Sequence, residues 1–300
     1  MNLALEVKNL SKRYKNKVDA LKNLNIKVEK GDFLALLGKN GAGKSTFIGI
    51  IASLIKKDYG KVSIFNKNID DIPDAVKTHI GIVPQEFNFP IFEKVIQILV
   101  SQAGYHGWGR KIAYQRAEKY LSMLNLTEKK NETAINLSGG MKRRLMIARA
   151  LMHEPSVIFL DEPTAGVDIE VRLKIWNFLS YLNKLGRTII LTTHYFEEAE
   201  RLCNSLAIIH RGKIIIHNSI SNIKKQYKNS IIIDIKCDKK TIKLLAEQRK
   251  ISVIYDNKIK IQLDNNINEL LLFLIENNVK ITNIRNCKNQ LEELFINLTK

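Results

Sequence analysis

A glycine-rich segment at residues 38–46 has the residue types and the spacing needed to bind a phosphate chain: Gly38-Lys39-Asn40-Gly41-Ala42-Gly43-Lys44-Ser45-Thr46. Its glycines permit backbone angles that a Cβ atom would forbid, so that successive N–H groups can surround a phosphate. A helix that starts near Lys44 would add its positive N-terminal end to the same anion site. We expect Lys44 to reach the β- and γ-phosphates of a nucleotide and the Ser45 hydroxyl to bind Mg²⁺. The alternative is a simple turn. A strand pattern before the segment and a helical pattern after it favour phosphate binding.

Two adjacent carboxylates, Asp161 and Glu162, directly follow the apolar run at 157–160, which predicts a strand that is buried on both faces. Because side chains alternate along a strand, the two carboxylates would point in different directions and could have different roles. One could support the Mg²⁺ bound to a nucleotide while the other orients the attacking water.

Gln85 and His194 also follow predicted strands, at 80–83 and at 188–193. Open parallel sheets bind ligands at the carboxyl ends of their strands, so both side chains are expected on the ligand edge. A glutamine amide can bind both a metal and a water, which suits a group that senses the γ-phosphate. A glutamine at the end of a strand is more commonly only solvated, and this alternative stays open.

A second helix start suited to an anion lies at Ser138-Gly139-Gly140. Ser138 is a good N-cap residue, and the two glycines leave the first backbone N–H groups of the helix uncovered. Tyr14 lies between two strand patterns upstream of the glycine-rich segment. Its ring could stack on an adenine or could be a half-buried packing residue.

The elements that must position these groups follow from periodicity. Alternating apolar residues near 5–7 and 24–28 predict antiparallel strands, and Tyr59-Gly60 predicts a turn before a further strand. Residues 86–154 lack strand patterns and have helical spacing at 92–101, 110–124 and 138–153, which predicts a helical subdomain inserted in an α/β domain. Between the first two helices, the aromatic loop at 104–109 could contact a partner protein or fold back on the helices.

The residues beyond about 218 have a different pattern. They predict a strand at 231–235, a helix at 241–247, a hairpin of 251–255 and 258–262, a helix at 267–276, a strand at 279–284 and a helix at 290–298. The order βαββαβ predicts a small α+β ferredoxin-like domain. It contains no catalytic constellation, so we place the chemistry in residues 1–218.

The composition of the 300 residues is that of an ordinary soluble protein, with 45% hydrophobic and 26% charged residues. The net charge of +18 suits an anionic partner, but the lysines are scattered with many asparagines, which indicates compositional bias. Three distant cysteines without metal-ligand spacing, Cys203, Cys237 and Cys287, indicate structural thiols in a reducing cytoplasm. No apolar stretch approaches the ~20 residues of a transmembrane helix, and no secretory signal is expected.

In combination, these segments resemble the ATPase subunit of ATP-binding-cassette (ABC) transporters over residues 1–218. Leu137-Ser138-Gly139-Gly140 resembles the signature sequence of that family, and its order relative to the glycine-rich loop, Gln85, Asp161-Glu162-Pro163-Thr164, Asp168 and His194 matches throughout. The sequences of segments 137–144, 161–168 and 193–200 are most similar to those of exporters whose ATPase and membrane subunits are separate chains. The implied fold is α/β: a P-loop ABC ATPase domain with a mixed sheet core, an antiparallel β subdomain and an inserted α-helical subdomain.

The resemblance implies a role for each matching residue. The cofactors are ATP and Mg²⁺, with the loop 38–46 on the phosphates, Tyr14 on adenine, and Ser45, Gln85 and Asp161 toward the metal. Glu162 is the base for water, His194 holds the γ-phosphate, and Gln85 links it to the helical subdomain. Two such domains pair head to tail, so that each ATP lies between one loop and the other domain's Ser138, Gly139 and Gly140, and Asp168 communicates across the dimer.

The sequence departs from the family pattern in two places: Met141 replaces the usual glutamine, and the loop before Asp168 contains Ala-Gly-Val in place of Ser-Ala-Leu. Neither change removes a group that ionises or binds metal, so we expect activity to be kept.

We therefore expect a cytoplasmic homodimeric ATPase, attached to the inner face of the cell membrane through a separate membrane subunit that contacts the region 86–108. An alternative is a soluble ABC ATPase acting on nucleic acid or ribosomes. Such proteins usually carry two cassettes in one chain or a long coiled coil, whereas this sequence has one glycine-rich loop, one signature sequence and no sustained heptads. This alternative is therefore disfavoured, and no nucleic acid is expected as a partner. A third alternative is the ATPase of an importer, which would differ mainly in the C-terminal region and in the partner. The sequence argues against it only weakly.

Overall fold

The computed structural model describes residues 2–71, 76–226, 230–236, 251–255, 258–262, 267–277, 279–286 and 290–299. The chain divides into two compact units, Met1–Ser219 and Ile220–Lys300. We call them the first and the second unit. The predicted helix at 241–247, Cys237 and Cys287 lie outside the described residues. None of the helices in the described part of the chain is long and apolar enough to cross a membrane.

The first unit contains a six-stranded, mostly parallel sheet in the order β10-β9-β3-β8-β7-β6, in which only the edge pair β10–β9 is antiparallel. Its strands are β3 (Phe33–Leu37), β6 (Ile80–Val83), β7 (Val157–Asp161), β8 (Thr188–Thr193), β9 (Ser205–His210) and β10 (Lys213–Ser219). Every residue of β3, β7 and β8 is buried, as their continuous apolar sequences predict.

A second, antiparallel sheet has the order β2-β1-β4-β5 and consists of β1 (Leu3–Arg13), β2 (Asp19–Glu29), β4 (Tyr59–Ile64) and β5 (Lys67–Asn68). The turn expected at Tyr59-Gly60 is wrong, because these residues begin β4. Tyr59 pairs with Ser11 across an irregularity in β1, and Gly60 has φ 95°. A Cβ on Gly60 would lie 2.5 Å from the Asn9 carbonyl oxygen, so the glycine is needed for a bulge and not for a turn.

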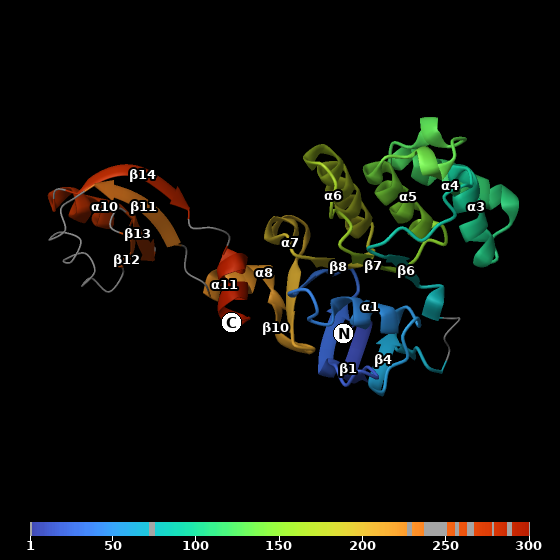
Figure 1. Cartoon of the computed structure of the whole chain (residues 1–300), viewed down its shortest axis with the longest axis horizontal. Helices are drawn as coiled ribbons and strands as arrows, with labels where there is room; N and C mark the ends of the chain where they lie inside the picture. The colour runs from blue at the N-terminus through green and yellow to red at the C-terminus, as the bar shows by residue number, and fades with distance from the viewer. Residues whose placement is uncertain are drawn as a thin grey trace. The chain divides into compact units, whose positions relative to one another are not determined.

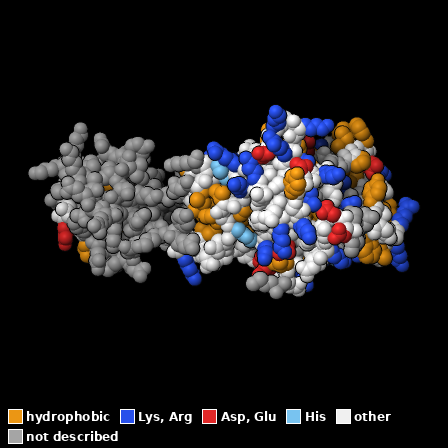
Figure 2. Space-filling view, turned by 90° about the horizontal axis from the view of Figure 1, so that it is seen from below, with side chains coloured by type: hydrophobic (Ala, Val, Ile, Leu, Met, Phe, Trp, Pro, Cys, Tyr) orange, Lys and Arg blue, Asp and Glu red, His pale blue; other side chains and the backbone are white. Residues whose placement is uncertain are grey.

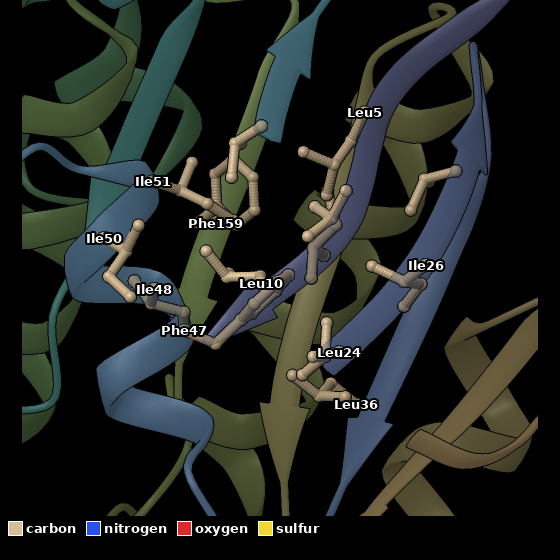
Figure 3. Packing of buried hydrophobic residues seen from close by; sticks show 14 of the residues in the cluster. Leu5, Leu10, Leu24, Ile26, Leu36, Phe47, Ile48, Ile50, Ile51 and Phe159 are labelled. Atoms are coloured by element: carbon tan, nitrogen blue, oxygen red, sulfur yellow. The ribbon is translucent and has the colours of Figure 1, made fainter. Parts of the chain in front are cut away.

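The core of the first unit lies between this antiparallel sheet, helix α1 (Lys44–Ile51) and one face of the parallel sheet (Figure 3). Leu5, Leu10 and Ile26 from the antiparallel sheet pack in one cluster with Phe47 of α1 and Phe159 of β7. The alternating apolar residues of β1 and β2 thus fix the face on which α1 is held.

The other face of the parallel sheet carries the helical insertion and the helices that follow β7 and β8 (Figure 1). These are α3 (Val95–Tyr105), α4 (Arg110–Met123), α5 (Gly139–Leu151), α6 (Ile169–Lys184) and α7 (Phe196–Leu202), with short 3₁₀ turns at Thr127–Lys129 and Ala134–Asn136. The helices α3, α4 and α5 pack on one another and form the predicted helical insertion. Cys203, which follows α7, is buried, and burial raises the pKa of its thiol.

The second unit has a four-stranded antiparallel sheet in the order β12-β13-β11-β14. Among the described residues, its elements are α8 (Ile220–Gln226), β11 (Ser230–Lys236), β12 (Ile251–Tyr255), β13 (Lys258–Gln262), α10 (Ile267–Glu276), β14 (Lys280–Asn286) and α11 (Gln290–Leu298). Numbered within this unit, the strand order is 2-3-1-4, which is the order of a ferredoxin-like sheet.

Lysine and arginine side chains are spread over the surface shown in Figure 2, among acidic and apolar side chains, and do not gather in one patch there.

Candidate functional site

The glycine-rich loop connects β3 to α1, at the carboxyl end of a central strand. Gly41 and Gly43 have φ of 79° and 112°, in the left-handed region that favours glycine. Gly38 is needed for a different reason from the one predicted, since its φ is not positive. A Cβ on Gly38 would lie 2.7 Å from both Cγ2 and the carbonyl oxygen of Ile209. Close packing against β9 excludes a side chain there.

Lys44 starts α1, and its side chain is buried. Its ammonium donates hydrogen bonds to the carbonyl oxygens of Gly38, at 2.7 Å, and Lys39, at 3.3 Å. Burial lowers the pKa of Lys44, whereas the charges of Glu162 and Asp161 raise it. The lysine and both carboxylates therefore share one electrostatic environment.

The carboxylates lie where β7 ends, and Thr192 of β8 holds both residues. The Thr192 hydroxyl donates to Oδ1 of Asp161, and the backbone N–H of Glu162 donates to the Thr192 hydroxyl and carbonyl oxygens, each at 3.1 Å. Glu162 has φ 50°, so the chain turns sharply out of the strand direction at this residue.

The Glu162 side chain contacts His194, which follows β8. Oε2 of Glu162 lies 3.3 Å from Nδ1 of His194. The carboxylate is largely buried, at 11% exposure, while the imidazole is half exposed, at 49%. A carboxylate oriented by an adjacent imidazole at the edge of a sheet, in the electrostatic environment of a buried lysine, can position and deprotonate a water.

Gln85 follows β6 and is exposed, and a residue that the sequence did not single out holds its backbone. Arg143 of α5 is buried, and its guanidinium donates to the carbonyl oxygens of Pro84, at 3.0 Å, and Gln85, at 2.9 Å. It also lies 5.1 Å from the centre of the Phe87 ring. Burial lowers the pKa of Arg143, and the charges of Asp161 and Glu162 raise it. The signal in the sequence was a basic residue on the apolar side of a predicted helix.

Ser138 caps α5 as predicted, and its hydroxyl oxygen accepts a hydrogen bond from the Met141 N–H at 3.3 Å. Ser138 and Gly139 are exposed. The fold does not bring this helix start to the glycine-rich loop, because α5 and α1 lie on opposite faces of the parallel sheet (Figure 1). Within the described residues, no hydrogen bond or ion pair joins Ser138, Gly139 or Gly140 to the loop at 38–46.

The other predicted site residues occupy different places around the loop. The Tyr14 hydroxyl lies 3.2 Å from the Thr46 hydroxyl, and the Tyr14 ring is 38% exposed beside the first turn of α1.

Asp168 is exposed and caps α6, accepting a hydrogen bond from the Val171 N–H at 2.8 Å. The exposed residues of the loop are Lys39, Asn40, Gly41 and Ser45, whereas Ala42 is buried.

The aromatic loop has one ring that is exposed and one that folds back on a helix. Tyr105 is 86% exposed, but Trp108 lies under the Arg116 guanidinium, 3.7 Å from the ring centre. The His106 ring stacks on that of His153, with 3.8 Å between centroids and 7° between planes.

A groove of about 290 Å³ lies between the end of α1, β6, α3 and α5. Its walls combine apolar side chains with basic ones and contain no carboxylate: Ile51, Ala52, Leu54, Lys77, Ile80, Ile82, Pro84, Asn88, Gln102, His106, Met146, Arg149, Ala150 and His153. Three of these residues, Asn88, Gln102 and His106, belong to the region 86–108 that we expect to contact a membrane subunit.

The family model described as ABC transporter matches residues 21–165. The chain is 31% identical over 305 residues to the linearmycin resistance ATP-binding protein LnrL of Bacillus subtilis, covering 98% of each. It is 37% identical over 215 residues to the Nod factor export ATP-binding protein I of Cupriavidus metallidurans, covering 72% of this chain and 71% of that protein.

Solved structures agree with these relatives. A dimeric ATP-binding cassette in a post-hydrolysis state, bound to ADP and Pi, superposes with a TM-score of 0.67 at 28% identity, over 72% of this chain and 98% of that one. The cbiO1 protein of Clostridium perfringens, part of the ABC transporter complex cbiONQ, gives a TM-score of 0.68 at 29% identity, over 75% and 92%. The chain therefore belongs to the ABC transporter family, as an ATP-binding subunit that hydrolyses ATP.

Proposed function

We propose that this chain energises export: it hydrolyses Mg-ATP as a homodimer and drives a separate membrane subunit at the inner face of the cell membrane. The names of the relatives support export, since one is a Nod factor export protein and another is a linearmycin resistance protein. The linearmycin resistance protein LnrL aligns over 98% of this chain, so the similarity extends into the second unit.

The main support for the proposed hydrolytic mechanism is the contact of 3.3 Å between Glu162 and His194, which lies in the electrostatic environment of the buried Lys44. In this proposal Lys44 exchanges its hydrogen bonds to loop carbonyls for bonds to the β- and γ-phosphates. Glu162 accepts a proton from the attacking water, and His194 holds the γ-phosphate. Backbone N–H groups of the loop and the start of α1 bind the remaining phosphate charge.

The residues proposed for Mg²⁺ fit the ion, since Ser45, Gln85 and Asp161 offer a hydroxyl, an amide and a carboxylate oxygen, and Mg²⁺ prefers oxygen ligands. The described residues contain no group of three or more His, Cys, Asp or Glu side chains placed to hold a metal. A single carboxylate is what a magnesium ion needs when nucleotide phosphates supply the other ligands. The ion would neutralise phosphate charge as it develops during hydrolysis.

The homodimer completes the site in this proposal. Ser138 and Gly139 present an exposed, capped helix start on the face of the sheet opposite α1, and a second copy could place them over the nucleotide bound at 38–46. The similar post-hydrolysis cassette with ADP and Pi is dimeric, which supports this arrangement.

The groove between α1, β6, α3 and α5 is proposed to receive a cytoplasmic helix of the membrane subunit. Its walls offer apolar side chains, such as Ile82 and Met146, next to Lys77 and Arg149. Leu54 at its border is 82% exposed. An amphipathic helix with an acidic residue would match both the apolar and the basic character of these walls.

The test is a pull-down of Glu162→Gln protein from solubilised membranes with Mg-ATP. Loss of a general base slows hydrolysis by ~10²–10⁴-fold, so the ATP-bound dimer should persist. We expect a multi-spanning membrane protein to be recovered. A second variant, Leu54→Asp on the same background, should lose that protein, whereas Tyr59→Asp, at a similarly exposed site outside the groove, should keep it. Recovery of ribosomes or RNA without a membrane protein would overturn the proposal.

A further inference from the structure

We propose that Glu198 is a positioning residue for ATP hydrolysis, which holds the segment of His194 against the segment of Glu162. This inference rests on the roles proposed above for these two residues and not on export. Glu198 lies in α7, four residues after His194, and its side chain is fully buried, at 0% exposure.

One oxygen of Glu198 joins three segments of the first unit. Oε1 accepts a hydrogen bond from the Thr164 hydroxyl at 2.8 Å and another from Nε1 of Trp176 at 2.8 Å. Thr164 follows Glu162 by two residues, and Trp176 belongs to α6. Both donors are almost fully buried, at 1% and 2% exposure. The segment after β7, helix α6 and helix α7 are therefore tied at a single carboxylate.

His194 is coupled to the position of α7 through its neighbour. The Tyr195 ring lies 4.1 Å from the His194 ring, and the Tyr195 N–H donates to the Thr193 hydroxyl at 3.0 Å. The Arg172 guanidinium of α6 lies 4.6 Å from the centre of the same Tyr195 ring. A shift of α7 relative to Thr164 would therefore change the distance of 3.3 Å between His194 and Glu162.

Stability alone does not account for a carboxylate at this position. Burial raises the pKa of Glu198, whereas its hydrogen bonds from Trp176 and Thr164, together with the charge of Arg172, lower it. Burying an ionisable group has a large desolvation cost, and a well-packed apolar residue of similar size is commonly as stable or more stable. The carboxylate differs from such a residue in fixing the direction of two hydrogen bonds, which is a property that positioning requires.

The test removes one hydroxyl at a time and compares kcat with KM. Thr164→Val keeps the shape of the side chain and loses the bond to Glu198. The matched control is Thr188→Val. Thr188 begins β8, at the end of the strand opposite His194, and its buried hydroxyl accepts a hydrogen bond from the Gly31 N–H at 2.9 Å. We expect Thr164→Val to lower kcat about tenfold with KM for ATP within about twofold, because small misplacements at a reacting centre mainly affect the transition state.

Three further variants complete the test. Thr164→Ser keeps a hydroxyl and should restore kcat to within about threefold, and Glu198→Gln keeps an acceptor oxygen and should do the same, whereas Glu198→Leu should match Thr164→Val. Binding of ADP and the near-ultraviolet circular dichroism spectrum show whether each variant is folded. An unchanged kcat in folded Thr164→Val, or an equal fall of kcat in Thr188→Val, overturns the proposal. Glu162→Gln is measured in parallel. If it keeps its activity, the role of Glu162 fails, independently of the result at Thr164.

Discussion

His153 shows how far burial can change the chemistry of one side chain. Its imidazole is 9% exposed, stacks on His106, and its Nε2 lies 2.8 Å from the carbonyl oxygen of Ile80. Burial, together with the charges of His106, Arg116 and Arg187, lowers its pKa to about 4, although the bond to Ile80 acts in the opposite direction. The neutral form is therefore the one that the folded chain holds at neutral pH.

We predict that acid destabilises the first unit through His153. An unfolded histidine has a pKa near 6.5, so between pH 6.5 and 4 the unfolded chain binds a proton that the folded chain excludes. The stabilisation is complete above pH 6.5 and is lost as the pH falls toward 4, by about 1–3 kcal/mol. Urea unfolding at pH 7 and pH 5, followed by tryptophan fluorescence, measures this loss.

His153→Asn should lose less stability than the parent chain between the two pH values, because it lacks the imidazole whose pKa is lowered in the folded state. An identical pH dependence in the parent and His153→Asn would exclude His153 as the cause.

At the scale of elements, α5 connects two proposed site residues that lie apart. Its first residues carry the exposed helix start at Ser138, and Arg143, in the following turn, holds the backbone of Pro84 and Gln85. A rigid helix transmits movement at one end to the other, so a ligand on Ser138 would affect the position of Gln85.

We predict that Arg143→Met lowers kcat about tenfold with a smaller change in KM, because the loop of Gln85 loses both of its hydrogen bonds to α5. The control is Arg144→Met, on the same helix. Arg144 is also buried and donates to two carbonyl oxygens, those of Leu124 and Asn125, at the end of α4. Both variants should lose stability. Steady-state ATPase assays that gave equal kcat values for the two would show that only folding had been affected.

The sequence predicted most elements correctly because their patterns are local. The continuous apolar runs of β3, β7 and β8 and the alternation in β1 and β2 report burial directly. Contacts between distant segments could not be predicted in this way. Arg143 and Gln85 are 58 residues apart, and Thr164 and Glu198 are 34 apart. Their meeting depends on how α5 and α7 pack, which no local pattern encodes. The steric reason for Gly38 is of the same kind, since it comes from Ile209 on another strand.

At the scale of the whole chain, the two units have separate cores. The buried cluster of Figure 3 lies entirely within the first unit, and residues such as Ile233, Ile259 and Leu274 are buried in the second. Both tryptophans, Trp108 and Trp176, lie in the first unit. Tryptophan fluorescence therefore follows the unfolding of that unit alone.

We predict that a chain ending at Ser219 folds and binds ATP, with an unfolding midpoint within about 3 °C of the full chain, because the cluster that stabilises the ATP site is retained. Thermal unfolding followed by tryptophan fluorescence, with and without Mg-ATP, checks this. A midpoint lower by 8 °C or more would mean that the second unit supports the first.

The left-handed backbone at Glu162 has a consequence for evolution and for engineering. A residue with a Cβ at φ 50° is strained by about 1 kcal/mol, and asparagine tolerates this region better than glutamate. Glu162→Asn should therefore abolish hydrolysis and yet raise the unfolding midpoint relative to Glu162→Gln, as differential scanning calorimetry would show. Equal midpoints would mean that the strain is already relieved. A library of variants of this cassette that is selected for heat resistance alone would accumulate inactivating substitutions at position 162. At this position the more stable residue is one that does not support ATP hydrolysis.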